Sequence, residues 1–308
     1  MSGPWRRWTV LGLLLTAATG LVALLGQHRL STPLKTSLAL PFQMLGTPVK
    51  LMDRLVSRLL PVDAVDERLL GDAYRESYGQ LISPNDPDQV YLDRLMTSLR
   101  SHTRRPFPYR AYVLSGYGGP NAMALPGGVV LVTRELLGVM ASEAELVAVL
   151  AHELGHIELG HCFDLVRFEL LARHRSSEPD STLGEIADQA VQLLIRHGYS
   201  KTTEHEADDY AYSLLVSSPY DPAALGSGMQ SMARAVEAAN GPERQQADPL
   251  MDYWLSHPPL PIRISEFEQK GAAWWRRHPG ERRYRGYRNL QKRQSFQDLS
   301  PPGEWRQG

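Results

Sequence analysis

The chain has 308 residues, of which 43% are hydrophobic and 22% are charged, and its formal net charge at pH 7 is −1. This composition is typical of a globular protein of one to two domains, and it excludes a protein held on nucleic acid by its overall charge. The single cysteine excludes an internal disulfide, so the sequence is compatible with a reducing or an oxidising compartment.

The N-terminal segment, residues 1–30, is predicted to be a membrane anchor or a signal segment. Residues 8–26 contain no charged side chain and follow Arg6 and Arg7. A spanning helix needs about 20 apolar residues, whereas the apolar part of a signal peptide has about 7–15. Because no clear small-x-small cleavage site follows, we expect one uncleaved helix in the lipid bilayer, with the rest of the chain on the periplasmic (extracytoplasmic) side. The alternative is a soluble periplasmic protein after signal cleavage.

Residues 31–65 are predicted to form an amphipathic helical linker. Between residues 41 and 60, apolar side chains recur at steps of three and four, and charged side chains occupy the other face. Such a helix either lies on the membrane surface or packs on its own domain, and the sequence leaves both options open. A globular body is expected to begin near Asp66, with a helix over residues 88–100 and a strand over residues 109–114.

The stretch from Asn121 to Thr133 predicts a β-hairpin. Two runs of strand-forming residues flank a Pro-Gly-Gly turn at residues 126–128, and Thr133 can cap the helix that follows. The edge of such a hairpin can accept an extended peptide as a further strand. An ordinary core hairpin would have the same sequence pattern.

His152, Glu153 and His156 form an HExxH pattern inside a predicted helix. Ser142 and Glu145 have the spacing of a capping box, and apolar residues at helical spacing follow them. One helical turn places both imidazoles on the same face, so they can bind one zinc ion while Glu153 holds the attacking water. The pattern therefore predicts a zinc hydrolase, and among these a peptidase.

A catalytic zinc site needs a third protein ligand. The metzincin spacing would need Gly and His where the chain has Leu159 and Cys162, so that pattern is not met. Cys162 could itself bind the metal, but a thiolate would give a more closed and electron-rich site. Glu204 and Asp208 stand four residues apart on a second predicted helix, which suits one carboxylate on the metal and one that orients a ligand. A solvated acidic helix face is the alternative for this segment.

The chain from residue 184 onward is predicted to be helical and then irregular. Residues 184–197 indicate a helix too short and polar to cross a membrane, residues 223–239 an Ala-rich helix, and a last helix begins near residues 260–262. From residue 271 the composition becomes basic and aromatic. Such a tail could contact anionic lipid or nucleic acid, but it is more typical of a solvated, loosely ordered extension.

Four blocks in the chain resemble one known family: residues 121–133, 152–156 and 204–208, and Ser256-His-Pro258 with Arg263. In this order they resemble the HtpX/BepA-like zinc metallopeptidases of peptidase family forty-eight, which include the type I CAAX prenyl protease. The resemblance implies an α+β fold: a mainly helical, zincin-like metallopeptidase domain of gluzincin type with a small β-sheet or hairpin. That domain is expected over residues 66–270, after one N-terminal transmembrane helix and before a basic, aromatic tail over residues 271–308.

The resemblance also implies the roles of the site residues. One Zn²⁺ would be bound by His152, His156 and Glu204, with Glu153 as the catalytic base and Asp208 orienting a ligand. His257 would lie near the metal, either capping its open position at rest or stabilising the tetrahedral intermediate, with Arg263 nearby. The substrate would bind along the hairpin edge at Asn121, Ala122, Met123 and Ala124.

We therefore expect a zinc-dependent endopeptidase that cleaves misfolded or membrane-associated proteins, a role in protein quality control, by means of a zinc-bound water activated by Glu153. Its expected partners are polypeptide substrates and, through the N-terminal helix, the lipid bilayer; no nucleic acid is expected. The alternative is a self-inhibited, zinc-binding, chaperone-like module with little turnover. Glu153 favours the enzyme, because a binding module has no chemical need for that base. The polar helix at residues 184–197 departs from multi-span relatives, so processing of prenylated peptides in a membrane chamber is not expected.

Overall fold

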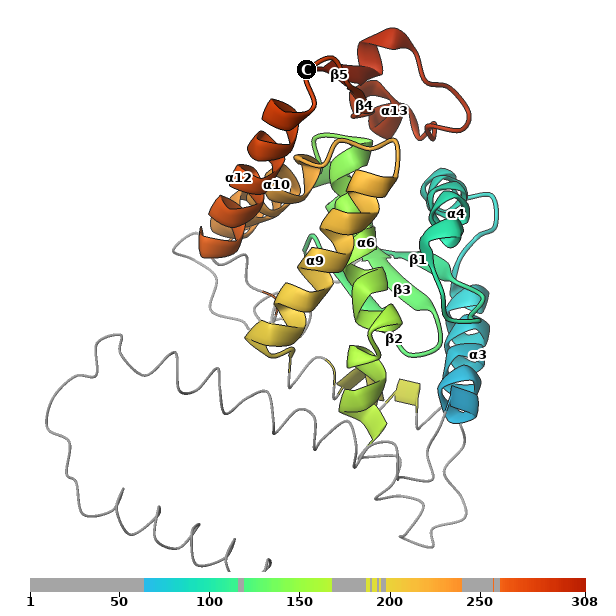
Figure 1. The fold of residues 1–308 in the computed structure, drawn as a ribbon. Helices are drawn as coiled ribbons and strands as arrows, with labels where there is room; N and C mark the ends of the chain where they lie inside the picture. Colours follow the sequence, from blue (N-terminus) through green and yellow to red (C-terminus); the bar gives the residue numbers. More distant parts are fainter. Residues whose placement is uncertain are drawn as a thin grey trace, which may run out of the picture. The chain divides into compact units, whose positions relative to one another are not determined.

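The computed structural model describes residues 64–115, 119–167, 187–188, 190–192, 194, 198–239, 257 and 261–308. The fold of these residues is α+β and mainly helical, as predicted (Figure 1). In chain order the helices and strands are α3 (Ala64–Leu81), α4 (Pro87–Leu99), η1 (Arg100–His102), β1 (Arg110–Leu114), β2 (Ala122–Leu125), β3 (Val129–Thr133), α5 (Arg134–Val139), α6 (Glu143–Glu158), α9 (Lys201–Ser217), α10 (Ala224–Ala239), α12 (Pro261–Arg277), β4 (Arg282–Tyr284), α13 (Tyr287–Lys292), η2 (Pro302–Glu304) and β5 (Trp305–Gln307).

The predicted hairpin belongs to a three-stranded sheet with the order β1-β3-β2. β3 pairs in parallel with β1 and antiparallel with β2, which makes β2 an edge strand of this sheet. The turn between β2 and β3 contains Gly127 at φ 78°, where a Cβ would lie 2.6 Å from the Cα of Gly71 on α3. Glycine at both positions therefore lets α3 pack directly on the turn, and β2 is held in place beside α6.

The two helices that carry the predicted metal ligands, α6 and α9, lie side by side (Figure 1). They approach closely at Gly155, where a Cβ would lie 3.1 Å from the Cα and from the carbonyl oxygen of Ala207. The small residues at this crossing allow the two backbones to approach closely. The ligand candidates on the two helices are thereby brought to one place.

The C-terminal segment corrects one prediction. The sequence favoured a loosely ordered extension after residue 271, but α12 continues to Arg277, and β4 and β5 form a two-stranded antiparallel sheet. The ring of Tyr284 is fully buried, and the N–H groups of Glu143 and Ala144, in the first turn of α6, donate to the carbonyl oxygens of Gly286 and Arg285. The basic and aromatic composition suggested a solvated tail, but the rings of Trp274, Trp275 and Tyr284 are buried in the protein.

The predicted anchor (residues 1–30) and the amphipathic helix at residues 41–60 lie outside the described residues. The linker predicted over residues 31–65 also lies outside them, except for its last two residues, which begin α3. No helix formed by the described residues is both long and apolar enough to cross a membrane.

Candidate metal centre

His152 and His156 lie on the same face of α6, as their spacing predicts. The helix begins where the side chain of Ser142 accepts a hydrogen bond from the backbone N–H of Glu145, and Glu145 in turn accepts one from the N–H of Ala141. Both histidines are buried, and their Nε2 atoms are 3.1 Å apart. Two imidazole nitrogens thus point to one position inside the protein.

Glu204, in the first turn of α9, supplies a carboxylate at the same position. Its Oε1 lies 3.3 Å from Nε2 of His156, and its Oε2 lies 3.6 Å from Nε2 of His152. Burial alone would raise the pKa of Glu204, but the neighbouring His257, His156 and His152 hold this pKa well below its usual range. The carboxylate is therefore ionised, which is the form that binds a metal.

His257 joins this group from a different part of the chain. Its Nδ1 lies 2.5 Å from Oε1 of Glu204, and its ring lies edge-on to the rings of His152 and His156. One ligand atom from each of the four residues lies within 4.8 Å of the others. The structure therefore brings His257 to the ligand cluster, as the family resemblance implies.

The donor set fits a zinc ion. Two ligands at about 2.0–2.1 Å from one zinc ion in a tetrahedral arrangement are about 3.3–3.4 Å apart. The separations of 3.1, 3.3 and 3.6 Å among His152, His156 and Glu204 are close to this value before any metal is added. Burial also lowers the pKa of His156 well below its usual value, which favours the neutral imidazole that a metal requires.

Asp208 and Arg263 lie behind His152. The Nδ1 atom of His152 is 2.9 Å from Oδ1 of Asp208, and Arg263 donates to both oxygens of this carboxylate at 2.7 Å. Arg263 also lies 3.0 Å from Oε2 of Glu204. Burial alone would raise the pKa of Asp208, but His152 and Arg263 lower it, so the carboxylate stays charged and orients the ring of His152.

Glu153 is buried between α6 and the sheet. Its Oε2 accepts a hydrogen bond from the backbone N–H of Ala124 at 2.8 Å. Burial raises the pKa of Glu153 to about 8; His152 opposes this rise and the charge of Glu204 adds to it. A carboxyl group with a raised pKa beside two potential metal ligands has the chemistry of a general base.

The four residues predicted to bind substrate lie on β2 or at its start, and all are buried. Asn121 pairs with Thr133 through its backbone: its carbonyl oxygen accepts from the N–H of Thr133 at 2.8 Å. In an antiparallel pair, every second residue directs its backbone N–H and C=O toward the neighbouring strand. The backbone groups of Met123 therefore point toward β3, whereas those of Ala122 and Ala124 point away from it. Ala124 contacts Glu153, and Asn121 immediately precedes the strand, three residues before Ala124.

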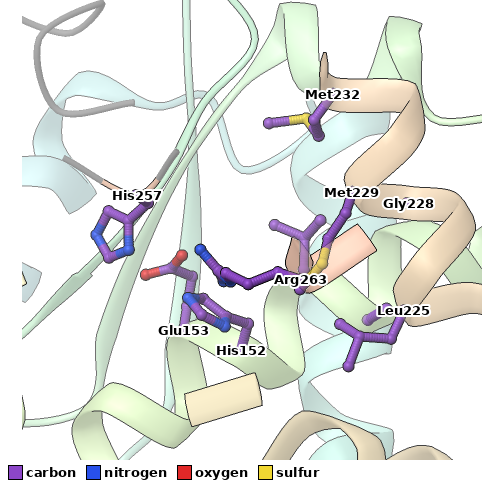
Figure 2. A pocket seen from close by; sticks show the side chains of 10 residues that line it. His152, Glu153, Leu225, Gly228, Met229, Met232, His257 and Arg263 are labelled. Carbon is purple, nitrogen blue, oxygen red and sulfur yellow. The ribbon is translucent and has the colours of Figure 1, made fainter. Parts of the chain in front are cut away.

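An apolar pocket opens beside the metal cluster. Its polar side is formed by His152, Glu153, His257 and Arg263, and its apolar side by Ala148, Val149, Leu225, Gly228, Met229 and Met232. Figure 2 shows Arg263 between His152 and Glu153 on one side and Leu225 and Met229 of α10 on the other. The pocket therefore has one wall suited to chemistry and another suited to a hydrophobic side chain.

The sequence did not identify several residues of this region. Leu225, Met229 and Met232 carry no motif, and only the packing of α10 on α6 brings them to the pocket. His161 has no role in the site that the sequence predicts, although its ring is buried beside His156. Cys162 is not a member of the ligand cluster; its thiol contacts the backbone oxygen of His156 at 3.8 Å.

Comparison with known proteins agrees with this geometry. A sequence profile described as Peptidase family M48 matches residues 88–270, which is more than half of the chain. Metalloprotease LoiP of Escherichia coli K12 is 28% identical over 140 residues, which are 43% of this chain and 54% of LoiP. Metalloprotease YcaL of the same organism is 27% identical over 215 residues, 66% of this chain and 78% of YcaL. Mitochondrial metalloendopeptidase OMA1 of Schizosaccharomyces pombe is 26% identical over 213 residues, 66% of this chain and 60% of OMA1. The chain thus spans only about half of LoiP.

Proposed function

Because the chain belongs to Peptidase family M48, we propose that it is a zinc-dependent endopeptidase. The observation that carries this proposal is the buried group of His152, His156 and Glu204, whose ligand atoms converge on one position. These three residues would bind the metal. Misfolded or membrane-associated proteins are the substrates that we propose, and the apolar residues 8–26 motivate a location at a membrane, with the catalytic domain on the extracytoplasmic side.

The chemistry divides between the metal and the residues around it. When bound, zinc would polarise the scissile carbonyl and lower the pKa of the attacking water. Glu153 takes the proton of that water and later delivers it to the leaving amine. The N–H of Ala124 fixes one oxygen of Glu153 and so orients the base. Arg263 and His257 lie on the same side of the pocket, where they can stabilise negative charge on the reacting carbonyl oxygen.

The edge strand β2 is the proposed binding site for the peptide backbone. The backbone groups of Ala122 and the carbonyl group of Ala124 point away from β3, whereas the N–H of Ala124 already donates to Glu153. An extended peptide that pairs with these groups would place its backbone beside the base and the metal. Because this pairing uses main-chain atoms, it would impose little sequence preference.

Preference would come instead from the apolar pocket. Val149, Leu225 and Met229 line its apolar side within reach of Glu153, so it suits a hydrophobic side chain next to the scissile bond. Unfolded proteins expose such side chains, whereas native proteins bury most of them. The pocket therefore supports the proposal that unfolded segments are the substrates.

One observation favours a second candidate function. His257 lies in the ligand cluster with its Nδ1 2.5 Å from Glu204, and as a fourth ligand it would fill the position that the attacking water needs. In that arrangement the protein would be a self-inhibited, zinc-binding, chaperone-like module with little turnover.

The test compares zinc content and casein cleavage in the full-length chain, purified in detergent. The wild type is expected to bind one zinc and cleave, Glu153→Gln to retain the zinc without cleavage, and Glu204→Ala to lose the zinc. One zinc per chain without cleavage in the wild type would favour the self-inhibited module, and His257→Ala should then restore cleavage. A wild type that binds no zinc would contradict both candidates.

A further inference from the structure

His156 has a polar partner that the proposed mechanism does not use. Its Nδ1 lies 3.1 Å from Nδ1 of His161, and Nε2 of His161 lies 3.1 Å from Oε2 of Glu206. His156 and His161 are buried, whereas the side chain of Glu206 is 35% exposed. A continuous polar chain therefore connects a metal-ligand candidate to a carboxylate at the protein surface.

The end of α6 explains how His161 reaches this position. The helix ends at Glu158, and Gly160 follows with φ 80°, a conformation that other residues rarely adopt. A second helical segment, residues 161–167, begins immediately afterwards. After this break in the helix, the first side chain of the second segment, His161, lies against the ring of His156. Glu206 comes from α9, two residues after Glu204.

The ring of His156 is also held from its face. The ring of Tyr199 stacks on it, with a centroid separation of 3.8 Å and an interplanar angle of 15°. Stacking restricts the tilt of the imidazole but tolerates rotation of the ring by half a turn about its Cβ–Cγ bond. The contact from Nδ1 to His161 restricts that rotation, so the two neighbours together define the orientation of the ring.

The positions of the protons follow from the metal site. A neutral histidine that binds a metal through Nε2 carries its proton on Nδ1. The Nδ1–H of His156 therefore donates to Nδ1 of His161, which must act as an acceptor. The proton of a neutral His161 is then on Nε2, where it donates to Glu206. Both contacts are satisfied by this assignment, and with a neutral His161 the opposite tautomer would place two N–H groups against each other.

The two ligand histidines thus have different supports. His152 contacts Asp208, a fully buried carboxylate that Arg263 holds with two hydrogen bonds. The Nδ1 atom of His156 instead contacts a histidine, His161, which in turn contacts the carboxylate of Glu206. We propose that His161 and Glu206 are positioning residues, which fix the tautomer and the orientation of His156 for metal binding. This inference rests on the proposed zinc site.

The proposal predicts the zinc affinity of variants of the full-length chain, measured by competition with a chelator. Loss of a partner of a metal-ligating histidine typically weakens metal binding by about 10–100-fold. His161→Leu, which leaves the Nδ1–H of His156 without an acceptor, should show a loss of this size. His161→Asn keeps one acceptor and one donor and should recover part of it. Glu206→Gln should have a smaller effect than His161→Leu.

Matched controls come from α9, the helix that carries Glu206. His205→Asn and Asp209→Asn change a histidine and a carboxylate of α9 that lie in exposed ion pairs away from the metal cluster. Their zinc affinity should equal that of the wild type. Thermal melting of the metal-free forms shows whether each variant is folded.

Two results would overturn the proposal. One is an unchanged zinc affinity in folded His161→Leu, and the other is an equal loss in His161→Leu and His161→Asn, which would indicate packing alone. If the wild type itself binds no zinc, the proposed function fails as well; if the wild type binds and cleaves while His161→Leu binds equally well, only the positioning role fails. A histidine ¹H–¹⁵N spectrum of the zinc-loaded protein gives an independent readout: the proposal requires His161 protonated at Nε2, and protonation at Nδ1 alone would contradict it.

Discussion

The two ends of α6 are held in different ways. At the N-terminal end, the carboxylate of Glu143 accepts hydrogen bonds from the hydroxyls of Tyr91 and Tyr220, and the C-terminal segment accepts from the first N–H groups of the helix. At the other end, His152 and His156 face α9 and the proposed metal. Nine residues separate Glu143 from His152, which corresponds to about 14 Å along a helix.

This difference indicates that one end of α6 contributes mainly to stability and the other mainly to the proposed metal site. Changes near Glu143 should alter the free energy of unfolding with little effect on zinc affinity, whereas changes near His152 should alter zinc binding or turnover with little effect on the unfolding of the metal-free protein. Gly155 is the exception, because it lies both in the HExxH segment and at a close backbone contact with α9. The predictions below test this separation.

The largest effect is expected for Glu153→Gln. The amide oxygen of Gln can still accept from the N–H of Ala124, but Gln cannot take a proton at neutral pH. Removing a general base typically lowers the rate by about 10²–10⁴-fold. Casein cleavage should fall by this amount while the zinc content and the melting temperature remain those of the wild type. A loss of stability in this variant would show that chemistry and stability are not separate at this end of α6.

At the other end, Glu143 should make stability depend on pH. Burial raises the pKa of Glu143 to about 7, although hydrogen bonds from Phe296, Tyr220 and Tyr91 oppose the rise. Because the folded-state pKa exceeds the unfolded value of about 4.5, the folded state binds the proton more tightly. The stability that the protonated form contributes is present below pH 4.5 and is lost as the pH rises to about 7, at most about 3 kcal/mol.

Glu143→Gln should remove this dependence. Denaturant unfolding of the wild type and the variant between pH 5 and pH 8 measures this dependence. As the pH rises, the unfolding free energy of the wild type should fall relative to that of the variant. Zinc affinity at constant pH should be the same in both proteins. Parallel stability curves would show that Glu143 does not titrate in this range.

A smaller effect on both properties is expected for Gly155→Leu. Even the Cβ atom would lie 3.1 Å from the backbone of Ala207, and overpacking of this kind costs about 1–3 kcal/mol. Because α9 carries Glu204, its displacement should also weaken zinc binding. Gly79→Ala is the matched control, since a Cβ at this exposed position of α3 meets no atom within 4 Å. That control should leave zinc binding unchanged and slightly raise stability. A zinc affinity of Gly155→Leu equal to that of the wild type would show that the contact at Gly155 does not position Glu204.

The smallest effect concerns the apolar pocket. Met229→Ala enlarges the side that faces the catalytic residues and should shift the preference toward larger side chains next to the scissile bond. A change of one or a few methylene groups in such a pocket typically alters the ratio of kcat/KM values by about 10-fold or more. Paired peptides that differ only in Leu or Phe at this position measure the ratio. No change in it would show that the pocket does not receive a substrate side chain.

The sequence predicted the elements whose signals are local. The capping residue Ser142 and the apolar spacing that follows it indicated α6, and the Pro-Gly-Gly turn indicated the hairpin. Glu204 was favoured because a carboxylate four residues before another on a helix suits a metal site, and the structure places it beside both histidines. These features depend on periodicity and caps, which a single sequence contains.

Other features depend on contacts between distant residues and could not be predicted. His161 gains its position from the break in the helix at Gly160 and from its contact with α9, so its spacing to His156 had no meaning by itself. The C-terminal segment was misjudged because its arginines suggested solvent, whereas Tyr284 and Trp275 are buried against the body of the protein. Composition indicates the average environment of a segment, but not which of its side chains find partners.

The most direct test of the proposed metal centre is zinc X-ray absorption on the zinc-loaded full-length chain. The account predicts a first shell of nitrogen and oxygen atoms only, at about 2.0–2.1 Å, with two imidazoles from His152 and His156. A sulfur neighbour at about 2.3 Å would place Cys162 on the metal instead and would contradict the assignment of Glu204 as the third ligand.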